Sequence, residues 1–241
     1  MESECTRKLA VFDYHGTLIW ALDIHDRAFR NTVKELYGVD GSIHDVQFAA
    51  STVQSVVKGI ARAGGISEEA ISQKEKLILG VYEKNFANAL KQGHPIILPG
   101  VQGLLRLLTE KNFILGLYSG ESKNTLETIL SKSGLNKYFD KKLIAYASRD
   151  APVSNRKELL LEAIEKAKRK YGEIPYGSVF LFDDSATGIC AGKELGVVTV
   201  AVSTGLDKFE KLASLKPDYL YRDFSTPEKV VGRLTKHSNH Y

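Results

Sequence analysis

The sequence is poor in cysteine and contains no long hydrophobic run. Its 241 residues include two cysteines, Cys5 and Cys190, which are too few and too far apart to indicate a disulfide framework or a zinc site. No apolar stretch approaches the roughly 18 residues that a membrane span needs. The first residues, MESECTRK, are polar and lack the apolar segment of a signal peptide. We therefore expect a soluble, cytoplasmic protein with no membrane partner.

The chain also lacks a marked excess of charge of either sign. It has 33 Lys and Arg against 29 Asp and Glu, a formal net charge of +4. A balance this close to neutral gives no reason to expect a nucleic-acid partner. Internal repeats and low-complexity segments are absent from the sequence. With 43% hydrophobic residues, the chain suits one globular domain, or a domain with an insertion, that buries a sizeable core.

The stretch that organises the rest is KLAVFDYHGTL, from Lys8 to Leu18. Its apolar run LAVF predicts a buried strand, because the run is short, contains β-branched and aromatic residues, and ends in a turn signal. Asp13 follows the run directly, and Gly16-Thr17 ends the strand. Carboxylates at the C-terminal end of a buried strand lie where α/β folds place their chemistry. Gly16 would let the backbone approach a ligand closely.

A helical segment follows, from Ile19 to about Pro99. Apolar residues recur there at the spacing of amphipathic helices with one buried face, as in Val53, Val56-Val57 and Ile60. About 80 residues therefore separate the first strand from the next, far more than a parallel crossover needs. We expect an inserted helical domain over 19–98, with a core formed by 1–18 and 99–241. The connections at 19–25 and 92–100 are either hinges or rigid links.

Strands and helices alternate after Pro99. Strands are expected at 113–118, 143–147, 178–182 and 197–202, with another at 219–221, and helical spacings lie between them. This alternation predicts βαβ units, and hence a Rossmann-like α/β core with a mainly parallel sheet and helices on both faces.

Three of the expected strands end in unusual polar residues: Asp13, Ser119-Gly120 and Asp183-Asp184. The carboxyl ends of parallel strands lie at one edge of the sheet, so we expect these residues to converge. Convergent carboxylates repel one another unless a cation lies among them. Mg²⁺ is commonly held by one or two carboxylates together with waters and a substrate phosphate.

These motifs resemble those of the haloacid dehalogenase-like hydrolases. The family's phosphatases carry D-x-D-G-T after an apolar strand, and this chain has Asp13-Tyr14-His15-Gly16-Thr17. Ser119-Gly120 is similar to the second motif, and VFLFDDSATG, from Val179 to Gly188, is similar to the fourth. The long helical segment resembles the cap of the family's phosphoglycolate phosphatase and β-phosphoglucomutase branch.

The resemblance implies a Mg²⁺-dependent phosphatase that hydrolyses a small phosphorylated metabolite, as a monomer or homodimer. Asp13 would be the nucleophile that forms an aspartyl-phosphate. Metal ligands would come from Asp13, the His15 carbonyl, Asp184 and Asp183, with Gly188 where some members carry another acid. Phosphate would contact Gly16, Thr17, Ser119 and Gly120. The basic residue of the third motif would be Lys157, with Arg156 as the alternative.

His15 departs from the family pattern, because it stands where the phosphatases have their acid/base Asp. Three interpretations remain open. His15 is a working acid/base, or it marks an enzyme weakened by roughly the 10²–10⁴-fold that such catalysis supplies, or it marks other chemistry. The rival function is a catalytically impaired protein that binds a phosphoryl ligand. His25, His44 and His94 show no metal-ligand spacing and are expected at the surface or in loops.

Overall fold

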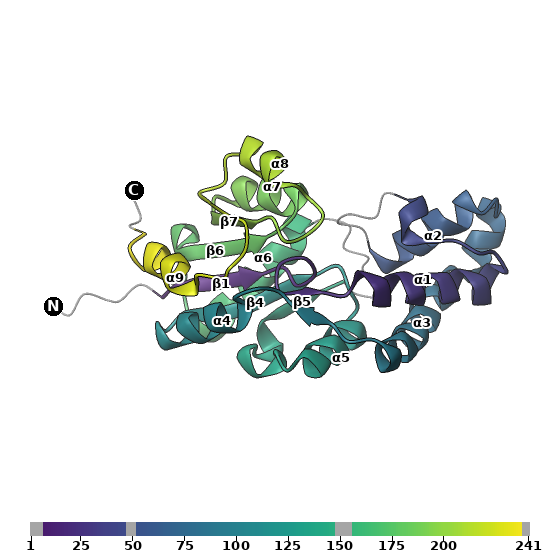
Figure 1. Ribbon diagram of the computed structural model, residues 1–241, viewed down its shortest axis with the longest axis horizontal. Coiled ribbons are helices and arrows are strands. Elements are labelled where there is room, and N and C mark those ends of the chain that lie inside the picture. Colours follow the sequence, from purple (N-terminus) through teal and green to yellow (C-terminus); the bar gives the residue numbers. More distant parts are fainter. Residues whose placement is uncertain (1–6, 47–51, 148–155, 238–241) are drawn as a thin grey trace.

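A computed structural model describes residues 7–46, 52–147 and 156–237 of the chain. Its main feature is a six-stranded parallel sheet in the order β5-β4-β1-β6-β7-β8 (Figure 1). The strands are β1 (Leu9–Phe12), β4 (Ile114–Ser119), β5 (Ile144–Tyr146), β6 (Val179–Asp183), β7 (Val198–Val202) and β8 (Tyr219–Tyr221). The predicted α/β fold class is confirmed.

Strand β1 lies in the middle of the sheet, between β4 and β6. Its four residues are all buried, as expected for a continuous apolar run in a sheet covered on both faces. Ala10 and Phe12 belong to one hydrophobic cluster and Leu9 and Val11 to the other. This alternation follows from the two-residue period of a strand.

Helices cover both faces of the sheet. The Phe12 cluster includes side chains of α4 (Val101–Glu110), α5 (Lys123–Ser133) and α9 (Pro227–Thr235). The Leu9 cluster is built mainly on α6 (Arg156–Tyr171), beside which α7 (Ala186–Leu195) lies. The short α8 (Phe209–Ser214) packs near α7 and β7. Single 3₁₀ turns occur at Asn136–Tyr138, Lys141–Leu143 and Tyr176–Ser178.

A helical insertion, which we define as residues 22–92, lies beyond the carboxyl end of the sheet (Figure 1). It contains α1 (Leu22–Tyr37), a 3₁₀ turn at Ile43–Asp45, α2 (Val53–Ala63) and α3 (Glu68–Gln92). Helix α1 ends at Gly38, whose φ of 74° suits glycine. Thr52 and Ser67 cap the N-termini of α2 and α3 through their hydroxyl groups.

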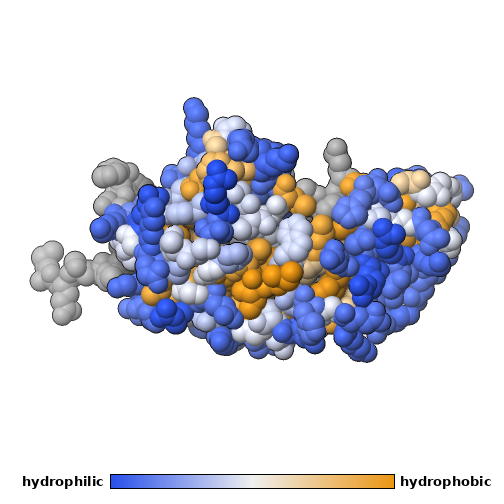
Figure 2. All heavy atoms as spheres, viewed as in Figure 1, coloured by the Kyte–Doolittle hydropathy of each residue, from blue (hydrophilic) through white to orange (hydrophobic). Residues whose placement is uncertain are grey.

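Two short strands join the helical insertion to the rest of the chain. β2 (Ile19–Trp20) and β3 (Ile96–Ile97) pair antiparallel, so both connections run side by side. Figure 2 shows polar residues over the outside of the helical insertion and apolar residues gathered along the middle of the molecule, where the insertion meets the sheet core.

No helix within the described residues is both long enough and apolar enough to cross a membrane.

Candidate active site

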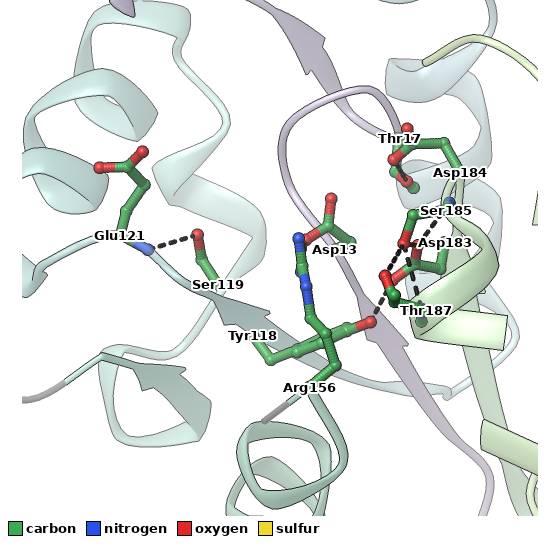
Figure 3. Close-up of polar contacts among 11 residues, drawn as sticks. Asp13, Thr17, Tyr118, Ser119, Glu121, Arg156, Asp183, Asp184, Ser185 and Thr187 are labelled. Atoms are coloured by element: carbon green, nitrogen blue, oxygen red, sulfur yellow. Dashed lines mark hydrogen bonds and ion pairs between the residues drawn. The ribbon is translucent and has the colours of Figure 1, made fainter. Parts of the chain in front are cut away.

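The polar residues at the ends of three neighbouring strands lie together, as the sequence predicts. Asp13 follows β1, Ser119 ends β4, Asp183 ends β6, and Asp184 follows it directly. Because β1 pairs with both β4 and β6, these residues share one edge of the sheet (Figure 3). Asp13 and Ser119 are each 3% exposed and Asp184 is 6% exposed, so the charged groups lie in an environment of low polarity.

Arg156 supplies the cation at this edge. It is the first residue of α6, and its guanidinium donates to Oδ1 of Asp13 while lying over the Tyr118 ring at 5.4 Å. The neighbouring Lys157 is turned away, with its Nζ 3.0 Å from Oε2 of Glu194. Of the two residues predicted for the basic position, Arg156 is therefore the one seen in contact with Asp13. One residue along a helix is a rotation of roughly 100°, so adjacent residues cannot both face Asp13.

Asp184 is packed against two loops. Thr17 donates its hydroxyl to Oδ1 of Asp184 at 3.1 Å. Gly16 has a φ of +90°, and a Cβ at this position would overlap the Asp184 carboxylate. Thr204, in the loop after β7, donates to the Gly16 carbonyl at 2.6 Å, and Gly205 in the same loop also leaves no room for a Cβ beside Asp184. Glycine is therefore required at both positions by close approach to this carboxylate.

Asp183 has different neighbours from Asp184. Its Oδ1 accepts hydrogen bonds from the backbone N–H of Ser185 at 2.7 Å and from the Ser185 hydroxyl at 2.6 Å. Its Oδ2 accepts from the Tyr118 hydroxyl. A Cβ on Gly188 would overlap the Asp183 carboxylate. Both oxygens of Asp183 are thus engaged in bonds that tie β4 to the start of α7.

Burial governs the electrostatics of Asp13 and Asp184. Burial raises the pKa of Asp13 to about 6, with Arg156 opposing the rise and Asp183 adding to it. Burial also raises the pKa of Asp184 well above its usual value, and the charges of Asp13 and Asp183 raise it further. Two buried carboxylates that destabilise each other's charged forms are a fitting environment for a cation.

The donor set favours one kind of metal ion. Within 7–46, 52–147 and 156–237, no three His, Cys, Asp or Glu side chains are grouped so as to hold a metal. A metal that needs an all-protein cage, as structural zinc does, therefore does not fit. Asp13 and Asp184 do fit Mg²⁺, which is commonly bound by one or two carboxylates with waters and substrate phosphate completing its shell.

His15 lies beside Asp13 with its ring directed toward the start of α1. Its Nε2 is 3.3 Å from the Ala21 backbone N–H, which donates to it, and its ring is 5.2 Å from that of Trp20. Burial, and then the charge of Arg156, lower the pKa of His15 to about 4. The imidazole is therefore neutral at pH 7.

A cavity of about 110 Å³ separates this edge of the sheet from the helical insertion. Asp13, His15, Ser119, Gly120 and Arg156 line it on the side of the sheet. On the side of the helical insertion the wall is mostly apolar, formed beside His25 by Leu22, Phe29, Ile43, Val53 and Val56. The charged and polar residues at the sheet edge thus face an apolar surface that suits the carbon atoms of a small ligand.

Two residues of this region were missed by sequence reasoning. His25 was expected at the surface, but it is 5% exposed, with Nε2 2.9 Å from the Tyr14 hydroxyl and Nδ1 2.7 Å from the Tyr82 hydroxyl. Glu121 lies two residues beyond Ser119, and its backbone N–H donates to the Ser119 hydroxyl at 3.1 Å. The available signal for Glu121 was its position in the loop after a strand that ends in a site residue.

Comparisons with known proteins agree with this geometry. A family model described as haloacid dehalogenase-like hydrolase matches residues 7–196. Phosphoglycolate phosphatase of Synechococcus elongatus is 24% identical over 226 residues, which cover 94% of this chain and 96% of that protein. Pyrophosphatase PpaX of Oceanobacillus iheyensis is 25% identical over 223 residues, covering 92% and 95% respectively.

Solved structures show the same fold. β-Phosphoglucomutase from Clostridium difficile superposes with a TM-score of 0.72 at 18% identity, covering 95% of this chain and 98% of that one. A protein described as a predicted phosphoglycolate phosphatase, from Haemophilus somnus 129pt, gives a TM-score of 0.70 at 17% identity, with coverages of 95% and 100%. The family match spans most of the chain and contains Asp13, Ser119, Arg156 and Asp184, and on this basis the chain belongs to the haloacid dehalogenase-like hydrolases.

Proposed function

We propose that the protein is a Mg²⁺-dependent phosphatase that hydrolyses a small phosphate monoester through an aspartyl-phosphate on Asp13. The observation that carries this proposal is the position of Asp13, a buried carboxylate on the cavity, between Ser119 and Asp184 and paired with Arg156. The names of the two curated relatives, a phosphoglycolate phosphatase and a pyrophosphatase, support phosphorus–oxygen bond cleavage as the reaction.

In this mechanism a carboxylate oxygen of Asp13 attacks phosphorus, and the bond from phosphorus to the leaving oxygen breaks. Arg156 and the Ser119 hydroxyl balance the charge on the phosphoryl oxygens. Water then cleaves the acyl phosphate and restores Asp13. Asp13, Asp184 and the His15 carbonyl are the groups that would hold Mg²⁺, whose charge would stabilise the phosphoryl oxygens during transfer.

We assign the helical insertion, with its connections over 19–98, the role of a cap. Its apolar residues close the cavity from the side opposite Asp13. Closure of this kind excludes bulk water from the reacting groups and lets the cap choose the substrate. The paired strands β2 and β3 hold the two connections together, which favours movement of the cap as a unit.

A second candidate function is that of a catalytically impaired protein that binds a phosphoryl ligand. The observation behind it is the geometry of His15, whose Nε2 already accepts a hydrogen bond from the Ala21 backbone N–H. A ring held in this way has one nitrogen fewer for exchanging a proton with a leaving group. Such a protein would keep Asp13, Arg156 and Asp184 and turn over slowly.

Release of phosphate from an aryl phosphate, with and without Mg²⁺, tests the proposal. We expect release by the wild-type protein with Mg²⁺, and loss of it in Asp13→Asn and after chelation of the metal. His15→Asp should gain rate mainly on alkyl phosphates, by up to about 10²-fold, because aryl leaving groups need little help from an acid.

Each other outcome has a defined meaning. A loss of rate in His15→Asp would establish His15 as a working acid/base. Activity that appears only in His15→Asp would favour the binding protein. Full activity of Asp13→Asn, in a preparation free of other phosphatases, would refute the nucleophile.

A further inference from the structure

Glu121 has an oxygen atom that the protein does not satisfy. Its Oε2 is buried and has no hydrogen-bond partner among the described residues. A buried carboxyl oxygen without a donor costs free energy, so such an atom calls for a partner from outside the protein. The Glu121 side chain lines the same cavity as Asp13 and His15.

The neighbouring polar groups are already committed. Oε1 of Glu121 is 3.4 Å from Nδ1 of His25, but both ring nitrogens of His25 have shorter contacts with the hydroxyls of Tyr14 and Tyr82. Arg156, whose guanidinium donates to Asp13, is the only Lys or Arg among the described residues that line the cavity. Arg156 thus acts on Glu121 only through its charge, and Oε2 is left without a donor within the described part of the chain.

Glu121 and Asp184 lie on opposite sides of Asp13 (Figure 3). A phosphoryl group bound between Asp13, Ser119 and Arg156 would therefore lie between Asp184 and Glu121. The cavity is lined by Asp13, Glu121, Asp184 and Asp207 as acids, which makes it favourable to positive charge. Burial raises the pKa of Glu121 to about 8, with the charge of Arg156 opposing the rise and that of Asp13 adding to it, so a positively charged group bound beside Glu121 would favour its ionised form.

We propose that Glu121 is a specificity-determining residue, whose carboxylate accepts a hydrogen bond from an ammonium or hydroxyl group on the leaving group of the substrate. This inference rests on the proposed phosphatase function and adds the chemistry of the substrate to it. The expected substrates are small phosphate monoesters of amino alcohols or polyols. A leaving group that carries a carboxylate, like the one named for the Synechococcus relative, would oppose the ionised form of Glu121 instead of stabilising it.

Four two-carbon phosphates of similar size test this preference: 2-aminoethyl phosphate, 2-hydroxyethyl phosphate, ethyl phosphate and phosphoglycolate. Their dissociation constants are measured by calorimetry with Mg²⁺ on Asp13→Asn, which holds the ligands unhydrolysed. We expect 2-aminoethyl phosphate to bind at least about 10-fold more tightly than ethyl phosphate, since hydrogen bonds to charged groups are the stronger kind. 2-Hydroxyethyl phosphate should lie between them, and phosphoglycolate should bind most weakly.

The double variant Asp13→Asn/Glu121→Gln assigns the preference to Glu121. We expect the ratio of the dissociation constants of ethyl and 2-aminoethyl phosphate to fall to within about threefold, and phosphoglycolate to bind better than before. The matched control is Asp13→Asn/Glu127→Gln, which removes an acid of α5 that pairs with Lys141 and lies outside the cavity. This control should keep the original ratio.

Equal affinities for 2-aminoethyl and ethyl phosphate in Asp13→Asn would overturn the inference, because a water would then be the partner of Oε2. Tightest binding of phosphoglycolate would overturn it in favour of a protonated Glu121 that donates a hydrogen bond. Binding of none of the four ligands would also refute it. The ligand series on Asp13→Asn alone remains decisive if Glu121→Gln fails to fold. Failure of the phosphatase proposal is a separate result, recorded as absent phosphate release by the wild-type protein.

Discussion

At the scale of single residues, the identity of the basic residue in the site depends on which face of helix α6 is turned toward Asp13. For the basic residue that contacts the phosphoryl group, the sequence favoured Lys157 and kept its neighbour Arg156 as the alternative. The choice follows from where α6 begins and how it rests on β1 and β4. The hydrophobic pattern of the sequence does not determine how α6 is rotated about its axis. The apolar stripe of a helix is broad, so rotations that differ by one residue bury nearly the same side chains.

Alanine substitutions of this pair provide a matched test. Arg156→Ala should lower kcat/KM for an aryl phosphate by about 10²-fold or more, because it removes the cation that contacts Asp13 and that balances phosphoryl charge in the proposed mechanism. Lys157→Ala removes a contact with Glu194 at the surface and should leave kcat/KM within about threefold. Steady-state kinetics with a melting-temperature control decides the matter. An equal loss in both variants would contradict the assignment of the site cation to Arg156.

At the scale of the elements, the strands of the large sheet and the helices between them were predicted closely, whereas the short strands beside the helical insertion were not. The predicted strand over 178–182 is β6, Val179–Asp183, and the one over 197–202 is β7, Val198–Val202. These strands could be predicted because each is a continuous apolar run bounded by turn residues. The pairing of β2 with β3 was not foreseen, because two strands of two residues each carry no periodicity. His25 was misplaced for a related reason, since its burial depends on partners from the segments around Tyr14 and Tyr82.

Helix α7 and helix α3 each contain an interior glycine, and the two should respond oppositely to alanine. A Cβ at Gly188 would overlap the Asp183 carboxylate, whereas a Cβ at Gly80 would meet nothing within 4 Å. Gly188→Ala should therefore destabilise the protein by about 1–3 kcal/mol through overpacking. Gly80→Ala should stabilise it by about 0.5–1 kcal/mol through helix propensity. Urea denaturation measures both, and a stabilised Gly188→Ala would show that Asp183 is not held as described.

At the scale of the whole molecule, the helical insertion is tied to the core by polar contacts as well as by apolar packing. Glu83 of α3 accepts from the Ser122 hydroxyl at 2.6 Å and from the Asn124 side chain at 3.1 Å, both at the start of α5. His25 of α1 bonds to Tyr14, which follows β1. Glu121 lies within this junction, with its Oε1 3.4 Å from Nδ1 of His25.

The pH dependence of stability follows from the raised pKa of Glu121. Burial raises this pKa from 4.5 to about 8 in the folded protein, so the folded state binds a proton that the unfolded state has released. Stability linked to Glu121 is therefore complete below pH 4.5 and is lost as the pH rises toward 8. Glu121→Gln has no such proton, and its free energy of unfolding should exceed that of the wild type at pH 9 by on the order of 1 kcal/mol or more.

Urea denaturation at pH 7 and pH 9 tests this expectation. The difference between Glu121→Gln and the wild type should widen with pH, because other groups titrate equally in both proteins and cancel. Glu127→Gln, with the same chemical change on α5, should show no widening. A constant difference between Glu121→Gln and the wild type would contradict the raised pKa.

The order of strands in the sheet has a consequence for how the chain is made. β1 is synthesised first among the strands, yet its two neighbours, β4 and β6, begin at Ile114 and Val179. During translation the apolar segment LAVF therefore lacks its second partner until the chain through Asp183 has left the ribosome. Unpaired strand edges of this kind invite association between nascent chains. The arrangement that brings Asp13 beside Asp184 thus also delays assembly of the site until β6 has been synthesised.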